Sequence, residues 1–315
     1  MTLKKALSSR SKGDYSKSTL KLFEKVWQDD PTLESFVAFL SFQRDTGKIL
    51  SKQQYEYLID NYLEKDKRPN WFEFKLKWQL QNLCLEYEHH YNIQACRLNK
   101  GVKSPGILPL PWQRDGVTLI REQQKSWRIK WLEELSILAK DGIAVVGNSA
   151  TLDNKSQGED IDRHAAVIRF NQPITKPGYK RHFGSNTHTR VIAPNYRGPI
   201  PACDWIVISG PDMQYQLQNW THLMPALKRG SAIITIPIQY WASLVKLLEA
   251  PPSAGVLVLN YLRNQPSLMG NIKPFGFGYS FSKEQTYHAA DSKHLASTRH
   301  NWDAEAKAIN QWFSK

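Results

Sequence analysis

Two asparagines follow two neighbouring apolar runs of this sequence. Asn148 comes just after Ile143–Gly147, and Asn171 comes just after Ala166–Phe170. A carboxamide offers a carbonyl acceptor beside an amide donor, a pairing that can read the edge of a base or a ribose. A single asparagine at the end of a strand is usually a turn residue. Two at matched positions favour a nucleotide site built without a glycine-rich loop.

A second chemical signal lies in PPSAGVLVLNYLRNQ, residues 251–265. Pro251 and Pro252 stop a preceding helix, and Ser253 is placed to cap the N-terminus of the next one. The first turn, at Ala254 and Gly255, then presents unpaired N–H groups and the positive end of a helix dipole, which suits a phosphate. Taken alone, these residues are more typical of an ordinary capped core helix.

Further candidates for chemistry are a histidine and three acidic residues. In HNWDAE, Glu305 lies five positions after His300, although this spacing alone carries little weight. A histidine, with an ordinary pKa of about 6.5, can accept a proton from a hydroxyl near neutral pH. Asp160 and Asp162 form a D-x-D pair, which leaves a metal site open as an alternative.

These residues need a sheet to bring them together. β-branched runs at 144–146, 166–170, 191–193, 205–208 and 232–236 alternate with helical or loop segments. This alternation predicts an α/β fold with a largely parallel sheet. Ligands bind such sheets at the carboxyl ends of the strands, which is where the first asparagine lies.

The sequence before residue 143 predicts helices, because apolar residues recur at helical spacing between residues 14 and 98. Residues 100–116 are rich in proline and glycine, as a linker is. We expect a helical N-terminal region (1–105), which is a bundle or resembles a tetratricopeptide half-repeat at 13–31. A linker and connecting helix (106–142, with the helix from Val117 to Lys140) and a catalytic domain (143–315) follow it.

Composition limits the partners. The chain of 315 residues carries a net charge of +13, spread over both halves, and 41% hydrophobic residues, which is typical of a globular protein. The charge suggests an anionic partner: a nucleotide sugar, a nucleic acid or an anionic lipid surface. Cys84, Cys96 and Cys203 match no metal-ligand spacing and are expected to be reduced thiols.

The order of these motifs resembles glycosyltransferase family 29, the eukaryotic-type sialyltransferases. The family's long motif is matched from 143 to about 193 by Gly147, Asn148, Ser149, Gly158, Ile161, Asp162, His164, Val167, Arg169, Asn171, Gly184, Ser185 and Thr187. Residues 251–265 resemble the short motif, with Ser253-Ala254-Gly255 where the family has Ser-Thr-Gly. KPFGFG (273–278) resembles its ending, and HNWDAE resembles the last motif.

The resemblance implies a Rossmann-like single nucleotide-binding domain, of the GT-A-like variant that sialyltransferases have. It also implies an inverting transfer of sialic acid from CMP-sialic acid to a glycan hydroxyl, with no metal or other cofactor. His300 would be the general base, and the family motif also includes Glu305. Asn148, Ser149 and Asn171 would hold cytidine and ribose. His288, in TYHAAD (286–291), would contact the phosphate together with the helix start at Ser253, with His294 as its rival.

The sequence also departs from the animal enzymes. Ile143 stands where those enzymes have the first cysteine of a disulfide, and residues 251–280 contain no cysteine. No secretory signal or run of 18 apolar residues is present. We therefore expect a bacterial-style soluble relative, cytoplasmic or peripheral at the inner membrane. Its acceptor would be an oligosaccharide or lipid-linked glycan, with lipopolysaccharide or capsule precursors as our hypothesis.

Other functions stay open. CMP-Kdo shares the nucleotide and the 2-keto-acid sugar, so a CMP-Kdo-dependent transferase fits the same residues. A nucleic-acid-binding protein would explain the charge and the 11 tryptophans, but it predicts a clustered basic-aromatic surface; we expect no nucleic acid. A non-catalytic CMP-sugar-binding protein is a third possibility, and the retained His300 and Glu305 count against it. A dinucleotide oxidoreductase lacks its G-x-G-x-x-G.

Overall fold

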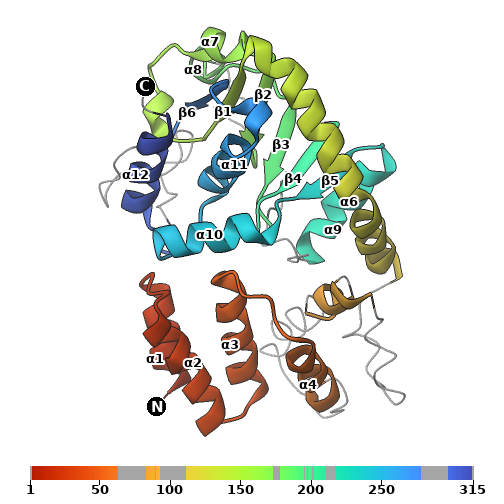
Figure 1. Ribbon diagram of the computed structural model, residues 1–315, viewed down its shortest axis with the longest axis vertical. Coiled ribbons are helices and arrows are strands. Elements are labelled where there is room, and N and C mark those ends of the chain that lie inside the picture. Colours follow the sequence, from red (N-terminus) through yellow and green to blue (C-terminus); the bar gives the residue numbers. More distant parts are fainter. Residues whose placement is uncertain are drawn as a thin grey trace.

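The apolar runs after residue 142 form one six-stranded sheet in the computed structural model. The strands are β1 (Ile143–Val146), β2 (Ala166–Phe170), β3 (Thr189–Ile192), β4 (Trp205–Ile208), β5 (Ala232–Thr235) and β6 (Ile272–Phe275). Their order is β5-β4-β3-β2-β1-β6, and neighbouring strands are parallel (Figure 1). The predicted α/β class with a mainly parallel sheet is confirmed.

The structure describes residues 2–62, 83–88, 90–92, 111–172, 178–194, 196, 198–200, 202–210, 217–277 and 297–313, without the side chains of 62, 117 and 217–222. His288 and its rival His294 therefore lie outside the described residues. So do residues 63–82, 89 and 93–98 of the segment in which the sequence predicts helices.

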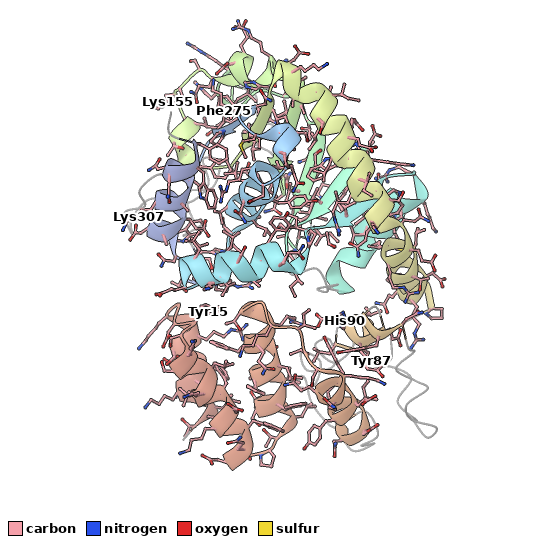
Figure 2. The ribbon with its side chains drawn as sticks, in the orientation of Figure 1. Tyr15, Tyr87, His90, Lys155, Phe275 and Lys307 are labelled. Atoms are coloured by element: carbon pink, nitrogen blue, oxygen red, sulfur yellow. The ribbon has the colours of Figure 1, made fainter. Side chains whose placement is uncertain are left out.

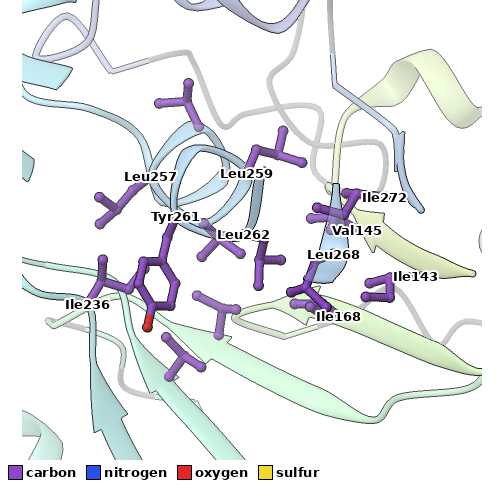
Figure 3. Packing of buried hydrophobic residues seen from close by; sticks show 14 of the residues in the cluster. Ile143, Val145, Ile168, Ile236, Leu257, Leu259, Tyr261, Leu262, Leu268 and Ile272 are labelled. Carbon is purple, nitrogen blue, oxygen red and sulfur yellow. The ribbon is translucent and has the colours of Figure 1, made fainter. Parts of the chain in front are cut away.

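Helices cover both faces of the sheet. One face is covered by α6 (Pro111–Leu138), α10 (Ile238–Leu248), α11 (Ala254–Arg263) and α12 (Trp302–Phe313). Figure 3 shows Leu262 of α11 in the apolar cluster that also contains Ile143 and Val145 of β1. The other face is covered by α7 (Gly158–Asp162), α8 (Lys180–Phe183) and α9 (Leu217–Lys228). β1 and β4 are buried and apolar at every position, as strands covered on both faces are, and these runs were predicted from the sequence. β6, which contains the exposed Lys273, was not predicted as a strand.

The connecting helix is longer than the sequence indicated. We expected it to begin at Val117, but α6 begins at Pro111, a residue that suits the first turn of a helix because the N–H it lacks would have no partner there. Trp131 is fully buried in the core of the sheet, and its Nε1 donates to Thr189 Oγ1 at 2.9 Å. The helix is therefore part of the same core as β1–β6.

The predicted N-terminal helices are confirmed in the described residues. They are α1 (Leu3–Ser11), α2 (Lys17–Asp29), α3 (Leu33–Asp45) and α4 (Lys52–Tyr62). Phe23, Phe36 and Phe42 are among the aromatic side chains of their separate core. This bundle, residues 2–62, lies against α10 (Figure 1), with Tyr15 at the junction (Figure 2). Within the described residues no helix is long and apolar enough to cross a bilayer.

Candidate active site

A cavity of about 440 Å³ opens at the carboxyl ends of the strands, between β1, β2 and β6 and the helices α11 and α12. Its volume is within the usual range for small-molecule sites. All predicted site residues that the structure describes line it: Asn148, Ser149, Asn171, Ser253, Ala254, Gly255, His300 and Glu305. The sheet therefore brings together residues that are up to about half the chain apart.

A close approach of two backbones forms the floor of the cavity. The Gly147 N–H donates to Phe275 O at 2.8 Å, continuing the pairing of β1 with β6 beyond the strand ends. A Cβ on Gly147 would lie 2.4 Å from the carbonyl oxygen of Gly276, closer than real Cβ atoms come. Gly276 itself has a φ of 67°. These two glycines permit the close approach of the two backbones, which places Asn148 at the cavity.

Each asparagine uses one half of its carboxamide to fasten the sheet. Asn148 Nδ2 donates to Phe170 O at 3.2 Å, and Asn171 Oδ1 accepts from the Ala193 N–H at 2.9 Å. Among the described residues, Asn148 Oδ1 and Asn171 Nδ2 have no partner. The Asn148 carbonyl oxygen and the Asn171 amide are thus available to a ligand in the cavity, whereas the other half of each side chain already has a partner in the sheet.

Asn171 has a strained backbone that other residues support. Its φ is 46°, a conformation that asparagine tolerates better than most residues. The buried Arg190 donates from Nη1 to Asn171 O at 2.8 Å. Ser149, the third predicted nucleotide contact, caps the short turn that follows, because its Oγ accepts from the Thr151 N–H at 3.3 Å.

Glu305 holds the start of α11. Its Oε1 accepts from the Ser253 N–H at 2.7 Å, and its Oε2 is 2.6 Å from Ser253 Oγ, which also caps the helix by accepting from the Val256 N–H. The Glu305 side chain is buried, and burial raises its pKa to about 7, against the lowering effect of the Ser253 hydrogen bonds. Glu305 therefore contacts the N-terminus of α11 rather than His300.

His300 is held as a neutral ring. Its Nδ1 lies 2.8 Å from Pro251 O, and since a carbonyl only accepts, Nδ1 carries the proton. Burial lowers the pKa of His300 to about 4, so Nε2 is unprotonated at neutral pH. The Trp302 ring packs edge-on against the imidazole at 5.1 Å between centroids. A neutral imidazole with one nitrogen fixed and the other without a described partner can accept a proton.

The aspartates of the D-x-D pair are engaged elsewhere. Asp160 forms an ion pair with Lys273 at 2.8 Å. Asp162 accepts from the backbone N–H groups of Ser185 and Asn186 at distances of 2.8 to 2.9 Å, and it lies 3.6 Å from the buried Arg169. Neither carboxylate lines the cavity. The described residues contain no group of three or more His, Cys, Asp or Glu side chains arranged to hold a metal ion.

Arg299 also lines the cavity, although it was not among the residues predicted from the sequence. Its Nη2 donates to Asp45 Oδ1 of α3 at 2.8 Å, and its guanidinium carbon lies 5.8 Å from the centroid of the Trp241 ring. The only signal available in the sequence was its position directly before His300. Nothing in the sequence indicated that its partner would be a residue of the N-terminal bundle.

Comparison with known proteins agrees with the motifs. Residues 127–197 match the family model described as glycosyltransferase family 29 (sialyltransferase). The match supports the resemblance to this family over that part of the chain. The matched segment contains the C-terminal part of α6, β1 to β3 and both asparagines.

The proteins similar to this chain carry more than one activity in their names. Beta-1,6-galactosyltransferase GALT29A of Arabidopsis thaliana is 26% identical over 195 residues, 51% of this chain and 48% of that protein. Beta-galactoside alpha-2,6-sialyltransferase 2 of Bos taurus is 45% identical over 49 residues, 16% of this chain and 10% of that protein. The chain thus spans about half, or less, of the length of these curated relatives.

A solved structure is also similar to part of the chain. It is a mammalian sialyltransferase in complex with Gal-beta-1-3GalNAc-ortho-nitrophenol, 20% identical, with a TM-score of 0.37 over 53% of this chain and 65% of that chain.

Proposed function

We propose that this protein transfers a sialic acid from a CMP-linked donor to a hydroxyl of a glycan acceptor, with His300 as the general base. The observation that carries the proposal is the state of His300: its ring is neutral, its Nδ1 proton is held by Pro251 O, and it lines the cavity beside the start of α11. A general base needs an unprotonated nitrogen, here Nε2, next to the bound substrates.

The reaction follows from that placement. His300 Nε2 accepts the proton of the acceptor hydroxyl. At the same time the hydroxyl oxygen attacks the anomeric carbon of the donor sugar from the face opposite the phosphate. The bond between the anomeric carbon and the phosphate oxygen breaks, and CMP leaves with the electron pair, which inverts the anomeric centre. The N-terminus of α11, at Ser253, Ala254 and Gly255, stabilises the negative charge that develops on the phosphate.

The remaining lining residues would hold the nucleotide. Asn148 Oδ1 can accept from a base or ribose donor, and Asn171 Nδ2 can donate to a ribose or base oxygen. The contact of His288 with the phosphate stays a prediction. Metal independence is also part of the proposal, and it is supported by the ion pair of Asp160 with Lys273 and by the backbone contacts of Asp162. The expected cytoplasmic or peripheral location stays a prediction too.

The donor sugar has two further candidates. CMP-Kdo keeps the nucleotide and the 2-keto-acid sugar. Galactose is favoured by a different observation: the relative named a galactosyltransferase aligns with 51% of this chain, whereas the sialyltransferase of Bos taurus aligns with 16%. The geometry of the proposed base is the same for each donor, because it acts on the acceptor hydroxyl.

Nucleotide release measures the proposal directly. The purified chain is incubated with CMP-sialic acid, CMP-Kdo or UDP-galactose, with lactose or lipopolysaccharide core as acceptor, and with or without EDTA. We expect acceptor-dependent turnover with CMP-sialic acid, and H300Q should lower kcat by about 10²- to 10⁴-fold. The matched control is H182Q, because His182 does not line the cavity and accepts from the Ser156 N–H at its Nδ1.

The outcomes separate the hypotheses. Full turnover by H300Q would remove His300 as the base while keeping the transferase. Turnover with UDP-galactose alone would replace the CMP-linked donor. Binding of CMP-sugars by the wild type without any turnover would favour the non-catalytic binding protein.

A further inference from the structure

The N-terminal bundle (residues 2–62) reaches the cavity through one carboxylate. Asp45, the last residue of α3, has an exposed fraction of 4%. Its Oδ1 accepts from Arg299 Nη2, its Oδ2 accepts from Arg10 Nη2, and its backbone oxygen accepts from Trp241 Nε1 at 3.0 Å. Arg299 is therefore fixed by a residue that lies 254 positions earlier in the chain.

These contacts leave a positive charge at the cavity. One carboxylate, Asp45, faces the two guanidinium groups of Arg10 and Arg299, so the cluster carries one uncompensated charge. Arg299 is the member that lines the cavity. Its Nε is buried without a partner in the described part of the chain, and its Nη1 makes no hydrogen bond there either.

Neighbouring groups do not neutralise this charge. His300 is uncharged at neutral pH because burial lowers its pKa to about 4. Glu305 directs both carboxylate oxygens to Ser253 rather than to Arg299. An arginine with donors to spare, held in one orientation, binds the oxygen pair of a phosphate or a carboxylate well.

We propose that Arg299 binds an anionic group of the donor substrate and that Asp45 of the N-terminal bundle is the residue that positions it. This inference rests on the proposed function. It makes the bundle, which the family match at 127–197 does not include, a part of the active site. It also bears on the substrate class. A CMP-linked 2-keto-acid sugar has a phosphate and a sugar carboxylate, whereas galactose itself carries no charge.

A ligand series measures which anion is bound. The dissociation constants of cytidine, CMP and CMP-sialic acid are determined by calorimetric titration of the wild type and R299Q. Cytidine has no anion, CMP adds the phosphate, and CMP-sialic acid adds the carboxylate. We expect R299Q to bind the anionic ligand about 10- to 100-fold more weakly, as loss of a charge-assisted hydrogen bond implies, and to leave cytidine unchanged.

The first ligand of the series that R299Q binds more weakly than the wild type identifies the anionic group that Arg299 contacts. A loss for both CMP and CMP-sialic acid assigns the phosphate, and a loss for CMP-sialic acid alone assigns the carboxylate. R299K, which keeps the charge but not the planar fork, should show an intermediate loss at the same step. R263Q is the matched control, because Arg263 lies at the last residue of α11, stacks on Trp312 and does not line the cavity; its three constants should equal those of the wild type.

Asp45 is tested through the same series. D45N should weaken the same ligand as R299Q does, and adding D45N to R299Q should change that constant by less than about 2-fold, because two residues that act through one contact are not additive. R10Q removes the other ion pair of Asp45 and keeps the contact with Arg299, so it should bind all three ligands as the wild type does.

Two results would overturn the inference. Equal loss of cytidine, CMP and CMP-sialic acid in R299Q would mean that Arg299 supports the fold of the cavity and binds no anion. Unchanged constants for all three would mean that Arg299 does not touch the ligand. If the wild type itself binds none of the three, the proposed function fails, and this inference fails with it; that outcome is seen before any variant is compared.

Discussion

Glu305→Gln should remove a specific part of the pH dependence of stability. Glu305 is buried, and its pKa is raised from 4.5 to about 7 by burial. Between these two values the folded state binds one more proton than the unfolded state, so the stability that this group contributes falls as pH rises. It is fully present below pH 4.5 and is lost as the pH passes 7.

The magnitude follows from the same two values. A pKa difference of one unit corresponds to about 1.4 kcal/mol, so the rise from 4.5 to about 7 amounts to roughly 3 kcal/mol. Glutamine keeps the size of the side chain and an acceptor for the Ser253 N–H, but it does not titrate. Relative to the wild type, E305Q should therefore gain about 3 kcal/mol of unfolding free energy between pH 4.5 and pH 8.

The assay compares the wild type with E305Q, because the titration of His300 opposes the pH effect of Glu305 on the stability of the wild type. The pKa of His300 is lowered from 6.5 to about 4, so its contribution rises with pH between those values, opposite in sign to that of Glu305. Urea unfolding of the wild type and E305Q at several pH values, followed by tryptophan fluorescence, isolates Glu305 in the difference. Parallel stability profiles from pH 4.5 to 8 would show that Glu305 is ionised in the folded protein at low pH, and would refute this reasoning.

The remaining predictions concern the cap, the strand end and the metal. S253A should lower the unfolding free energy by about 1–2 kcal/mol, through loss of a helix cap, and should weaken CMP binding; thermal unfolding and titration measure the two effects, and unchanged CMP affinity would argue against a phosphate at α11. N171G should be less damaging than N171A in urea unfolding, because glycine tolerates the φ of 46°; equal losses would mean that only the Ala193 hydrogen bond matters. D160N should keep full turnover in the presence or absence of EDTA, since Asp160 pairs with Lys273; a metal-dependent loss in D160N would restore the D-x-D hypothesis.

The sheet was predictable because its strands are buried on both faces. Runs such as Trp205–Ile208 are apolar at every position, which no exposed or one-sided element requires. The predicted strand at 191–193 is found at Thr189–Ile192, because Thr189 and the buried Arg190 belong to the strand although neither is apolar. A search for apolar runs does not detect polar residues inside a strand, even when hydrogen bonds satisfy their buried side chains.

The candidate site was predictable where a local motif marks it. Asn148, Asn171, Ser253 and His300 each lie at a strand end, a helix start or a motif position, and the parallel topology brings these places together. The partners of the asparagines could not be predicted in the same way. That Asn148 gives its amide to Phe170 O depends on the separation of two strands, which the sequence does not state.

The contact between Arg299 and Asp45 explains why the N-terminal bundle could not be assigned a role from sequence. Asp45 is the last residue of an amphipathic helix, and an acidic residue at that position indicates no function in the sequence. The role of Asp45 depends on its contact with Arg299. Burial is the main cause that lowers the pKa of His300, the positive charge of Arg299 lowers it further, and the negative charge of Asp45 raises it. The same ion pair therefore fixes the Arg299 guanidinium at the cavity and moderates its effect on the pKa of His300. The carboxylate that does this comes from a bundle with its own separate core.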